Sequence, residues 1–315
     1  MAINLKEIED FAVELAEAAG NILIVESRKR HDSKDIKLKM NAVDIVTETD
    51  EKVEKFIHDS IAARYPDHDF VGEESYSAGQ SKKYLVTDKP TWVVDPLDGT
   101  VNYVHLFPMI CVSVGFCLGG KPVAGAIHAP FLNQTYSAHL GGGAWLNRSV
   151  QLPLQLQPLP AEAPKGCIFA CEWGKDRRNI PQLNLTRKVA SFVNMAAQTG
   201  EDSLPGMCHG VRSMGSASLD LCFVASGAFD IWWEGGCWEW DVCAGFIIVE
   251  EAGGIITTAN PPEDRSLIPE AKLGGRLYLA VRGAPDVEGE TSRQAQERVV
   301  RAVWDRVHLL DYERP

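Results

Sequence analysis

The first residues of the chain place apolar side chains at helical spacing. One face of the predicted helix carries Leu5, Ile8, Phe11, Ala12, Leu15, Ala16 and Ala19. Asn4 precedes this run as an N-cap residue, and Glu7 stands three residues further on, as in a capping box. A second amphipathic helix is predicted from Thr49 or Asp50 to a point before Pro66.

The pattern changes to that of strands from residue 111 to 140. Three apolar stretches lie at 112–116, 122–127 and 135–140, separated by a Gly-Gly turn and by a turn around Asn133. Strands joined by such short turns predict an antiparallel meander.

The rest of the chain mixes helices and strands. Prolines interrupt residues 151–164, and this segment is predicted as the seam between two halves, 1–150 and 165–315, of a single domain over 1–315. The elements predicted after the seam are a strand near Ile168, helices over 185–197 and 216–226, a strand over 229–233, a helix over 241–252, strands near Ile255 and over 277–281, and a terminal amphipathic helix. Because strict βαβ alternation is missing, the pattern predicts a layered α+β fold rather than a Rossmann sheet.

Composition and charge narrow the class of protein. Of the 315 residues, 45% are hydrophobic and 23% are charged, and the net charge is −12, which argues against a disordered chain and against a nucleic acid or an acidic membrane as partner. The eight cysteines form no Cys-x-x-Cys pair, so they predict reduced core residues rather than a zinc site. The N-terminus lacks the uninterrupted core of a signal peptide, and no apolar run is long enough to span a bilayer. We therefore expect a soluble, cytoplasmic protein.

A strand that ends in acids is the first candidate for chemistry. The apolar run 92–94 leads into Asp95, and Asp98 follows three residues later. Between and after them, Pro96 stiffens the turn and Gly99 lets the backbone approach a ligand closely. The two acids are therefore predicted to converge on one cation. The alternative is that they only cap the turn or the helix that follows.

Two further acids fit the same site. Glu73 follows a short apolar pair, and Asp241 opens a long apolar helix, although Asp241 taken alone is better explained as an ordinary N-cap. The predicted oxygen ligands are the side chains of Glu73, Asp95, Asp98 and Asp241 and the carbonyl group of Leu97. An all-oxygen set of this kind suits Mg²⁺ better than zinc.

These motifs resemble those of the inositol monophosphatase family of magnesium-dependent, lithium-sensitive phosphatases. The resemblance rests on segments 72–75, 95–100 and 240–245, and it extends in the same order to 44–50 and 105–108. It implies the αβαβα sandwich of the inositol monophosphatase and fructose-1,6-bisphosphatase type, two or three Mg²⁺ ions per active site, inhibition by Li⁺, and a homodimer. It also implies that a metal-activated water hydrolyses a small phosphate monoester.

The resemblance assigns the metal ligands as well. One Mg²⁺ is implied at Glu73, Asp95 and the carbonyl of Leu97. A second is implied at Asp95, Asp98 and Asp241. The acids would thus attract the cations that in turn attract the anionic substrate.

The resemblance also implies how water and phosphate are handled. Thr100 and Asp50 are similar to the family's pair that orients or deprotonates the attacking water, and Glu73 is an alternative base. The backbone N–H groups of Gly99 and Thr100 are expected to bind phosphate oxygens. Asp98 and Asp241 are also expected to contact the substrate.

The alcohol part of the substrate is expected to meet residues of the second half. Gly215, Ser216 and Ala217 resemble the segment that lines the family's sugar pocket. Glu234 lies seven residues before Asp241, as the family's hydroxyl-binding acid does. Without the resemblance, Glu234 is equally well explained as a solvated strand end.

Segment 232–240 departs from the family in its number of tryptophans. Trp232 and Trp240 are predicted to be core anchors, since large aromatic side chains are usually buried. Trp238 and Glu239 are predicted to shape the mouth of the pocket, and this puts inositol in doubt as the preferred alcohol.

Three functions remain open at this point. The first is hydrolysis of inositol monophosphate to inositol and phosphate. The second is a phosphatase for another small sugar, quinate-type or nucleotide phosphate, because fungal chains of this family also occur with quinate-utilisation genes. The third is a catalytically silent, regulatory metal-binding protein on the same scaffold. The complete set of acids, with the pair of Thr100 and Asp50, favours an enzyme.

Overall fold

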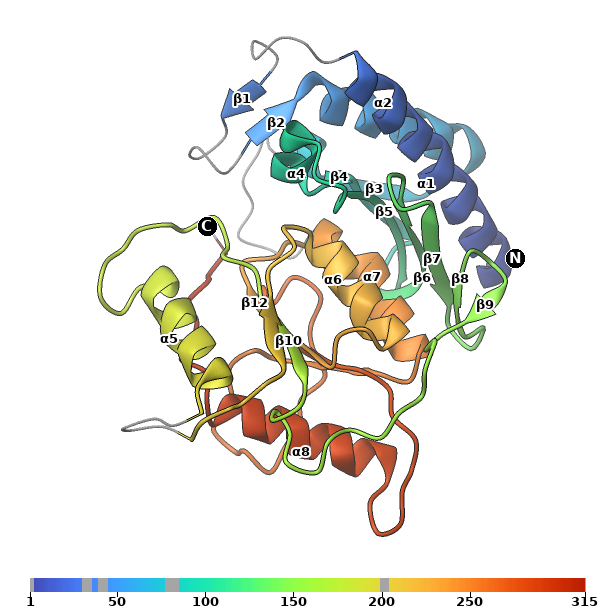
Figure 1. The fold of residues 1–315 in the computed structure, drawn as a ribbon. Coiled ribbons are helices and arrows are strands. Elements are labelled where there is room, and N and C mark those ends of the chain that lie inside the picture. Colours follow the sequence, from blue (N-terminus) through green and yellow to red (C-terminus); the bar gives the residue numbers. More distant parts are fainter. Residues whose placement is uncertain (1–2, 30–35, 39–44, 77–84, 199–203, 315) are drawn as a thin grey trace.

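Helices and sheets alternate in layers through the molecule (Figure 1). The computed structural model describes residues 3–29, 36–38, 45–76, 85–198 and 204–314. The helices are α1 (Leu5–Arg28), α2 (Glu48–Arg64), α3 (Glu73–Tyr76), α4 (Thr100–His105), α5 (Asn184–Ala196), α6 (Ala217–Ser226), α7 (Glu239–Glu251) and α8 (Ser292–Trp304). In the described part of the chain, no helix combines the length and the apolar character needed to cross a bilayer.

The larger sheet has seven strands in the order β3-β4-β5-β6-β7-β8-β9. Its strands are β3 (Asp69–Gly72), β4 (Thr91–Asp98), β5 (Cys111–Leu118), β6 (Lys121–Ala129), β7 (Gln134–His139), β8 (Ala144–Leu146) and β9 (Val150–Gln151). β3 pairs with β4 in parallel, and every later pair is antiparallel. The predicted meander is therefore confirmed and continues into two further short strands.

The smaller sheet has five strands in the order β11-β10-β12-β14-β13. They are β10 (Ile168–Ala170), β11 (Gly210–Arg212), β12 (Ile231–Gly235), β13 (Ile255–Thr257) and β14 (Leu277–Val281). A separate hairpin joins β1 (Ile36–Leu38) to β2 (Ile45–Thr47). The expected motif at 44–50 begins outside the described residues, because Asp44 is not among them.

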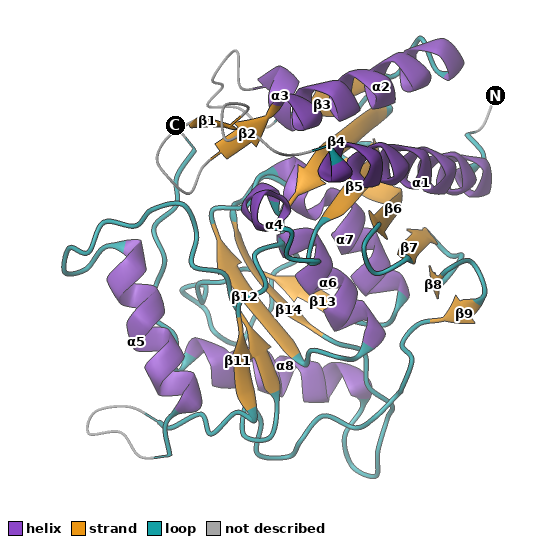
Figure 2. Ribbon diagram, turned by 45° about the horizontal axis from the view of Figure 1, so that its top comes forward, coloured by secondary structure: helices purple, strands orange, loops and turns teal. Residues whose placement is uncertain are grey.

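The order of the helix and sheet layers follows from which faces of the helices and sheets are apolar. α1 and α2 cover one face of the larger sheet, and α6 and α7 fill the space between the two sheets (Figure 2). α8 packs against the other side of the smaller sheet, and α5 lies beside β11. α7 is buried nearly all round, from Trp240 to Val249, as expected for a helix with a sheet on either side. The predicted layered αβαβα sandwich is confirmed.

Glycines let α7 sit close to the larger sheet. A Cβ atom on Gly115 of β5 would lie 2.9 Å from the Cβ atom of Cys243. On Gly125 of β6 it would lie 2.9 Å from the Cα atom of Ala244. Separations this short leave no room for a side chain, so these two glycines set the distance between helix and sheet.

We expect Gly125→Ala to lower the free energy of unfolding by about 1–3 kcal/mol, because the added methyl group overpacks a rigid contact. Urea unfolding of the purified protein measures this change. Lys121→Ala at the start of the same strand is the matched control, since that side chain is 69% exposed. Equal effects of the two substitutions would contradict the close packing of α7.

Candidate active site

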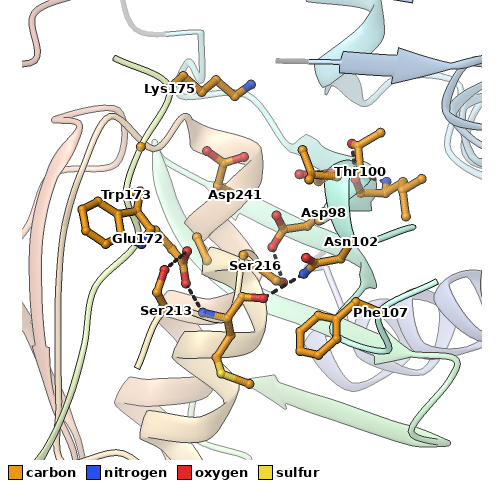
Figure 3. Close-up of a pocket in the computed structure, with 18 of the residues that line it drawn as sticks. Asp98, Thr100, Asn102, Phe107, Glu172, Trp173, Lys175, Ser213, Ser216 and Asp241 are labelled. Atoms are coloured by element: carbon orange, nitrogen blue, oxygen red, sulfur yellow. Dashed lines mark hydrogen bonds between the residues drawn. The ribbon is translucent and has the colours of Figure 1, made fainter. Parts of the chain in front are cut away.

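A cavity of about 420 Å³ opens where β4, α4, α6 and α7 meet (Figure 3). Its lining is formed by Glu73, Asp95, Leu97, Asp98, Gly99, Thr100, Val101, Asn102, Phe107, Glu172, Trp173, Gly174, Lys175, Arg177, Ser213, Met214, Gly215, Ser216, Ala217 and Asp241. All four predicted acidic ligands belong to this lining. The structure therefore brings together residues that are far apart in the sequence.

Asp95 and Asp98 lie at the end of β4, where the pairing with β5 becomes irregular. Asp95 is 2% exposed, and one of its oxygens accepts a hydrogen bond from the N–H of Leu97 at 2.9 Å. Asp98 does not cap α4, whose N-cap is Gly99 without a side-chain hydrogen bond. The sequence leaves open that these acids only stabilise the turn or cap the following helix. Asp95 does stabilise the turn, but neither acid caps α4.

Asp98 is held by the start of α6 instead. Its Oδ2 atom accepts hydrogen bonds from the Ser216 hydroxyl at 2.7 Å and from the Ser218 N–H at 2.8 Å. Ser216 is the N-cap of α6 and also accepts from the N–H of Leu219. The residues predicted to line a sugar pocket thus have a second task, because Ser216 fixes the orientation of Asp98.

Asp241 enters the cavity from α7. The sequence suggested that this acid begins the helix, but the N-cap is Trp238 and Asp241 is the third helical residue. Its Oδ2 atom accepts a hydrogen bond from the Trp238 N–H at 2.7 Å, which is one half of a capping box. Asp241 thus stabilises the helix start and still lines the cavity.

The pKa of each of the three aspartates is raised. Burial is the largest cause for each, and it is reinforced by the charges of neighbouring carboxylates. The pKa of Asp98 rises to about 6 although Ser216 and Ser218 donate to it, and the pKa of Asp241 rises to about 8 although Lys175 opposes the shift. The pKa of Asp95 lies well above its ordinary value.

The chemistry of this donor set fits a hard divalent cation. Each aspartate uses one oxygen for a hydrogen bond, and within the described residues the other accepts none. Among these residues, no three His, Cys, Asp or Glu side chains already form a compact metal cage. The fit to a cation follows instead from the charges of the acids, because a cation between them would relieve their repulsion.

Thr100 and Asp50 meet as the sequence suggested. The Thr100 hydroxyl lies 3.2 Å from Oδ1 of Asp50 and 3.2 Å from the carbonyl oxygen of Leu97. Asp50 is 1% exposed and lies behind Thr100, outside the cavity lining. Thr100 therefore stands between a buried carboxylate and the cavity.

The turn after Asp98 depends on two glycines and one amide. Gly99 has φ 88°, and a Cβ atom there would lie 2.7 Å from the carbonyl oxygen of Met109. The amide of Asn102 donates to the carbonyls of Met109 at 2.7 Å and Met214 at 2.8 Å. It also occupies the space beside Gly215, whose φ is 79°. Asn102 thereby joins α4 to the segment that precedes α6.

Glu234 is placed differently from the prediction of a direct substrate contact. It is 2% exposed, it is absent from the cavity lining, and it forms an ion pair with the fully buried Lys188. Its Oε2 atom accepts a hydrogen bond from the N–H of Glu172 at 2.5 Å. Glu234 therefore supports a wall of the cavity from behind.

The predicted role of Trp238 and Glu239 at the mouth of the pocket is wrong. Neither residue lines the cavity. Trp238 stacks on Trp240 at 5.4 Å and lies under the guanidinium of Arg276 at 4.0 Å, and Glu239 is fully buried and paired with Arg314. The predicted burial of Trp232 and Trp240 is confirmed.

Sequence reasoning missed the wall that faces the acids. In Figure 3, Glu172, Trp173 and Lys175 lie across the cavity from Asp98 and Thr100. This wall directly follows β10, so a strand that ends in polar residues was the available signal. The signal was weak, because β10 has only three residues.

Comparison with known proteins agrees with this geometry. The model of the inositol monophosphatase family matches residues 4–308. Quinic acid degradation cluster protein x of Neurospora crassa is 58% identical, covering 100% of this chain and 97% of the relative, and protein qutG of Emericella nidulans is 57% identical, covering 99% and 96%. Inositol monophosphatase 1 of Homo sapiens is 38% identical over 81% of this chain and 85% of its own length.

Similarity also extends to solved structures. The inositol monophosphatase of Anabaena (Nostoc) sp. PCC 7120 superposes with a TM-score of 0.70 at 30% identity, and 96% of each chain is covered. Fold and sequence identity thus agree over nearly the whole length. This chain belongs to the inositol monophosphatase family.

Proposed function

We propose that this phosphoric monoester hydrolase uses Mg²⁺ to release phosphate from a small cyclic polyol, with inositol monophosphate as the reference substrate. The observation that carries the proposal is the cavity in which Glu73, Asp95, Asp98 and Asp241 converge beside Thr100. When bound, the cations would neutralise the phosphate and lower the pKa of a water molecule. Glu73, Asp95 and the carbonyl of Leu97 would hold one cation.

The second cation would be held by Asp95, Asp98 and Asp241. Their bonded oxygens fix the carboxylates in place, which leaves their remaining oxygens directed by the fold rather than by a flexible side chain. Such preorganisation lowers the entropy lost on binding. Asp98 and Asp241 line the same cavity and would also contact the substrate.

The chain's own groups would complete the reaction. The Thr100 hydroxyl, which contacts Asp50, would orient the attacking water and pass its proton to the buried carboxylate. Glu73 is the alternative base. The backbone N–H groups of Gly99 and Thr100 would bind phosphate oxygens, because the first N–H groups of a helix have no partner within it. Gly215 and Ala217 would contact the alcohol.

A second substrate candidate follows from the relatives. Two fungal chains that are 58% and 57% identical bear the names quinic acid degradation cluster protein x and protein qutG. A quinate-type phosphate therefore stands beside inositol monophosphate. Phosphate release from a panel of inositol, sugar, quinate-type and nucleotide phosphates, with and without Mg²⁺ and Li⁺, distinguishes these candidates. No Mg²⁺-dependent release would favour a silent, regulatory scaffold.

We also propose that the protein is cytoplasmic and forms a homodimer. All eight cysteines are free and seven are buried, which suits the reducing cytoplasm. The family resemblance suggests a homodimer, and light scattering of the purified chain measures its mass.

Asp95→Asn and Asp241→Asn should each lower kcat by more than about 100-fold, because a ligand of the cations loses its charge. The metal-free variants should unfold at no lower temperature than the parent, since a buried negative charge is removed. Phosphate release and thermal unfolding measure both effects. Asp305→Asn on the surface is the control and should be fully active; full activity of either site variant would refute the metal assignment.

The stability of the metal-free protein should fall as the pH rises from about 4 to 8. Over this range the unfolded chain has lost protons that folded Asp98 and Asp241 keep, since their pKa values are about 6 and about 8 against an ordinary 3.8. Mg²⁺ should therefore raise the unfolding temperature at pH 8 by at least about 2 °C more than at pH 6. An equal shift at both pH values would contradict binding at these acids.

Ser216→Ala should lower both stability and activity. Loss of the N-cap costs about 1 kcal/mol, and loss of the hydroxyl frees Asp98 to turn away from its position. Thr291→Ala removes the analogous cap of α8, far from the cavity, and should cost similar stability without loss of kcat. If both variants kept full activity, Ser216 would be a cap and nothing more.

A further inference from the structure

The wall of the cavity opposite the acids carries positive charge. Within the described lining, the cationic side chains are Lys175 and Arg177, and both belong to the segment that follows β10. The acidic residues on the other side come from β4, α3 and α7. In a chain with a net charge of −12, an exposed arginine at one cavity wall, Arg177, creates a local field that favours an anion.

The acidic member of this wall, Glu172, forms no hydrogen bond with Arg177 in the described structure. Glu172 accepts a hydrogen bond from the N–H of Met214 at 2.5 Å and another from the hydroxyl of Ser213 at 2.8 Å. Both of its oxygens are thus used to join the wall to the segment before α6. Figure 3 shows these two bonds at the base of the wall.

A buried ion pair fixes the wall from behind. Lys188 contacts Glu234 and donates to the carbonyl of Glu172 at 2.7 Å, while Glu234 accepts from the N–H of the same residue. Both backbone groups of Glu172 are therefore held. Gly174 is confined too, since a Cβ atom there would lie 2.7 Å from the Tyr312 hydroxyl oxygen. The wall is a rigid support for the charged residues that follow.

Arg177 has donors left for a ligand. Its Nε atom donates to the carbonyl of Gly174 at 2.8 Å, and its terminal nitrogens donate to no group in the described part of the chain. The neighbouring Asp176 does not neutralise it, because that carboxylate forms a two-bond ion pair with Arg178. A guanidinium with two free nitrogens is suited to a carboxylate.

We propose that the natural substrate is a phosphate monoester whose alcohol part carries a carboxylate, and that Arg177 recognises this second anion. This inference rests on the proposed function, in which the phosphate occupies the acidic side with its cations. An uncharged polyol would meet Arg177 on the opposite wall without offering it an anion. A hydroxy acid would match both sides of the cavity.

A matched pair of esters tests the proposal. 3-Phosphoglycerate and glycerol 3-phosphate share a carbon skeleton and differ by a carboxylate in place of a hydroxymethyl group. With Mg²⁺ present, the wild-type chain should have about a tenfold higher kcat/KM for 3-phosphoglycerate, as one charge-assisted contact provides. Arg177→Gln should bring this ratio close to one, whereas Arg293→Gln, at an exposed arginine of α8 outside the cavity lining, should leave the ratio unchanged.

A wild-type ratio of one or less would overturn the proposal, and so would an Arg177→Gln variant that keeps the ratio. Equal losses in the Arg177→Gln and Arg293→Gln variants would also overturn it, because they would point to the overall charge of the protein rather than to a site. Absence of phosphate release from every ester would refute the proposed function instead. In that case calorimetric binding of the same two esters, with Mg²⁺, still measures the preference for the carboxylate.

Discussion

Mutual repulsion among buried carboxylates governs this molecule. Asp95, Asp98 and Asp241 are each held through one oxygen, by a backbone N–H of the following turn, by the start of α6 and by the start of α7. None can swing away, so burial and, after it, the charges of neighbouring carboxylates raise the pKa of each. A bound cation would remove this penalty, and the proposed affinity for metal would then come in part from the arrangement of the acids.

The arrangement depends on packing far from the cavity. Gly115 and Gly125 allow α7 to lie close to the larger sheet, and this closeness carries Asp241 towards the end of β4. The opposite wall is supported separately by the pair of Lys188 and Glu234. The packing of α7 therefore positions the acids proposed for the reaction. The ion pair of Lys188 and Glu234 supports the wall that is proposed to select the alcohol. Substitutions in the wall can change selectivity while the acids stay in place.

Periodicity predicted most helices and strands, because apolar faces leave a clear imprint on local sequence. The acids of β4 were found in the same way, from a strand that ends in charged residues. The capping of α7 by Trp238 was missed, since tryptophan is no usual N-cap. The role of Glu234 depends on Lys188, which lies 46 residues away in the chain, and local patterns carry no information on such a pair. The cavity wall around Glu172 was missed for the same reason.

The central claim is that these acids bind divalent cations at the end of β4. A crystal of the protein soaked in Mn²⁺, which shares the oxygen preference of Mg²⁺, tests it most directly through the anomalous scattering of the metal. Cation binding at these acids predicts anomalous peaks within coordinating distance of Asp95. One peak should lie towards Glu73 and one towards Asp98 and Asp241. A fully soaked crystal with no peak beside Asp95 would contradict it.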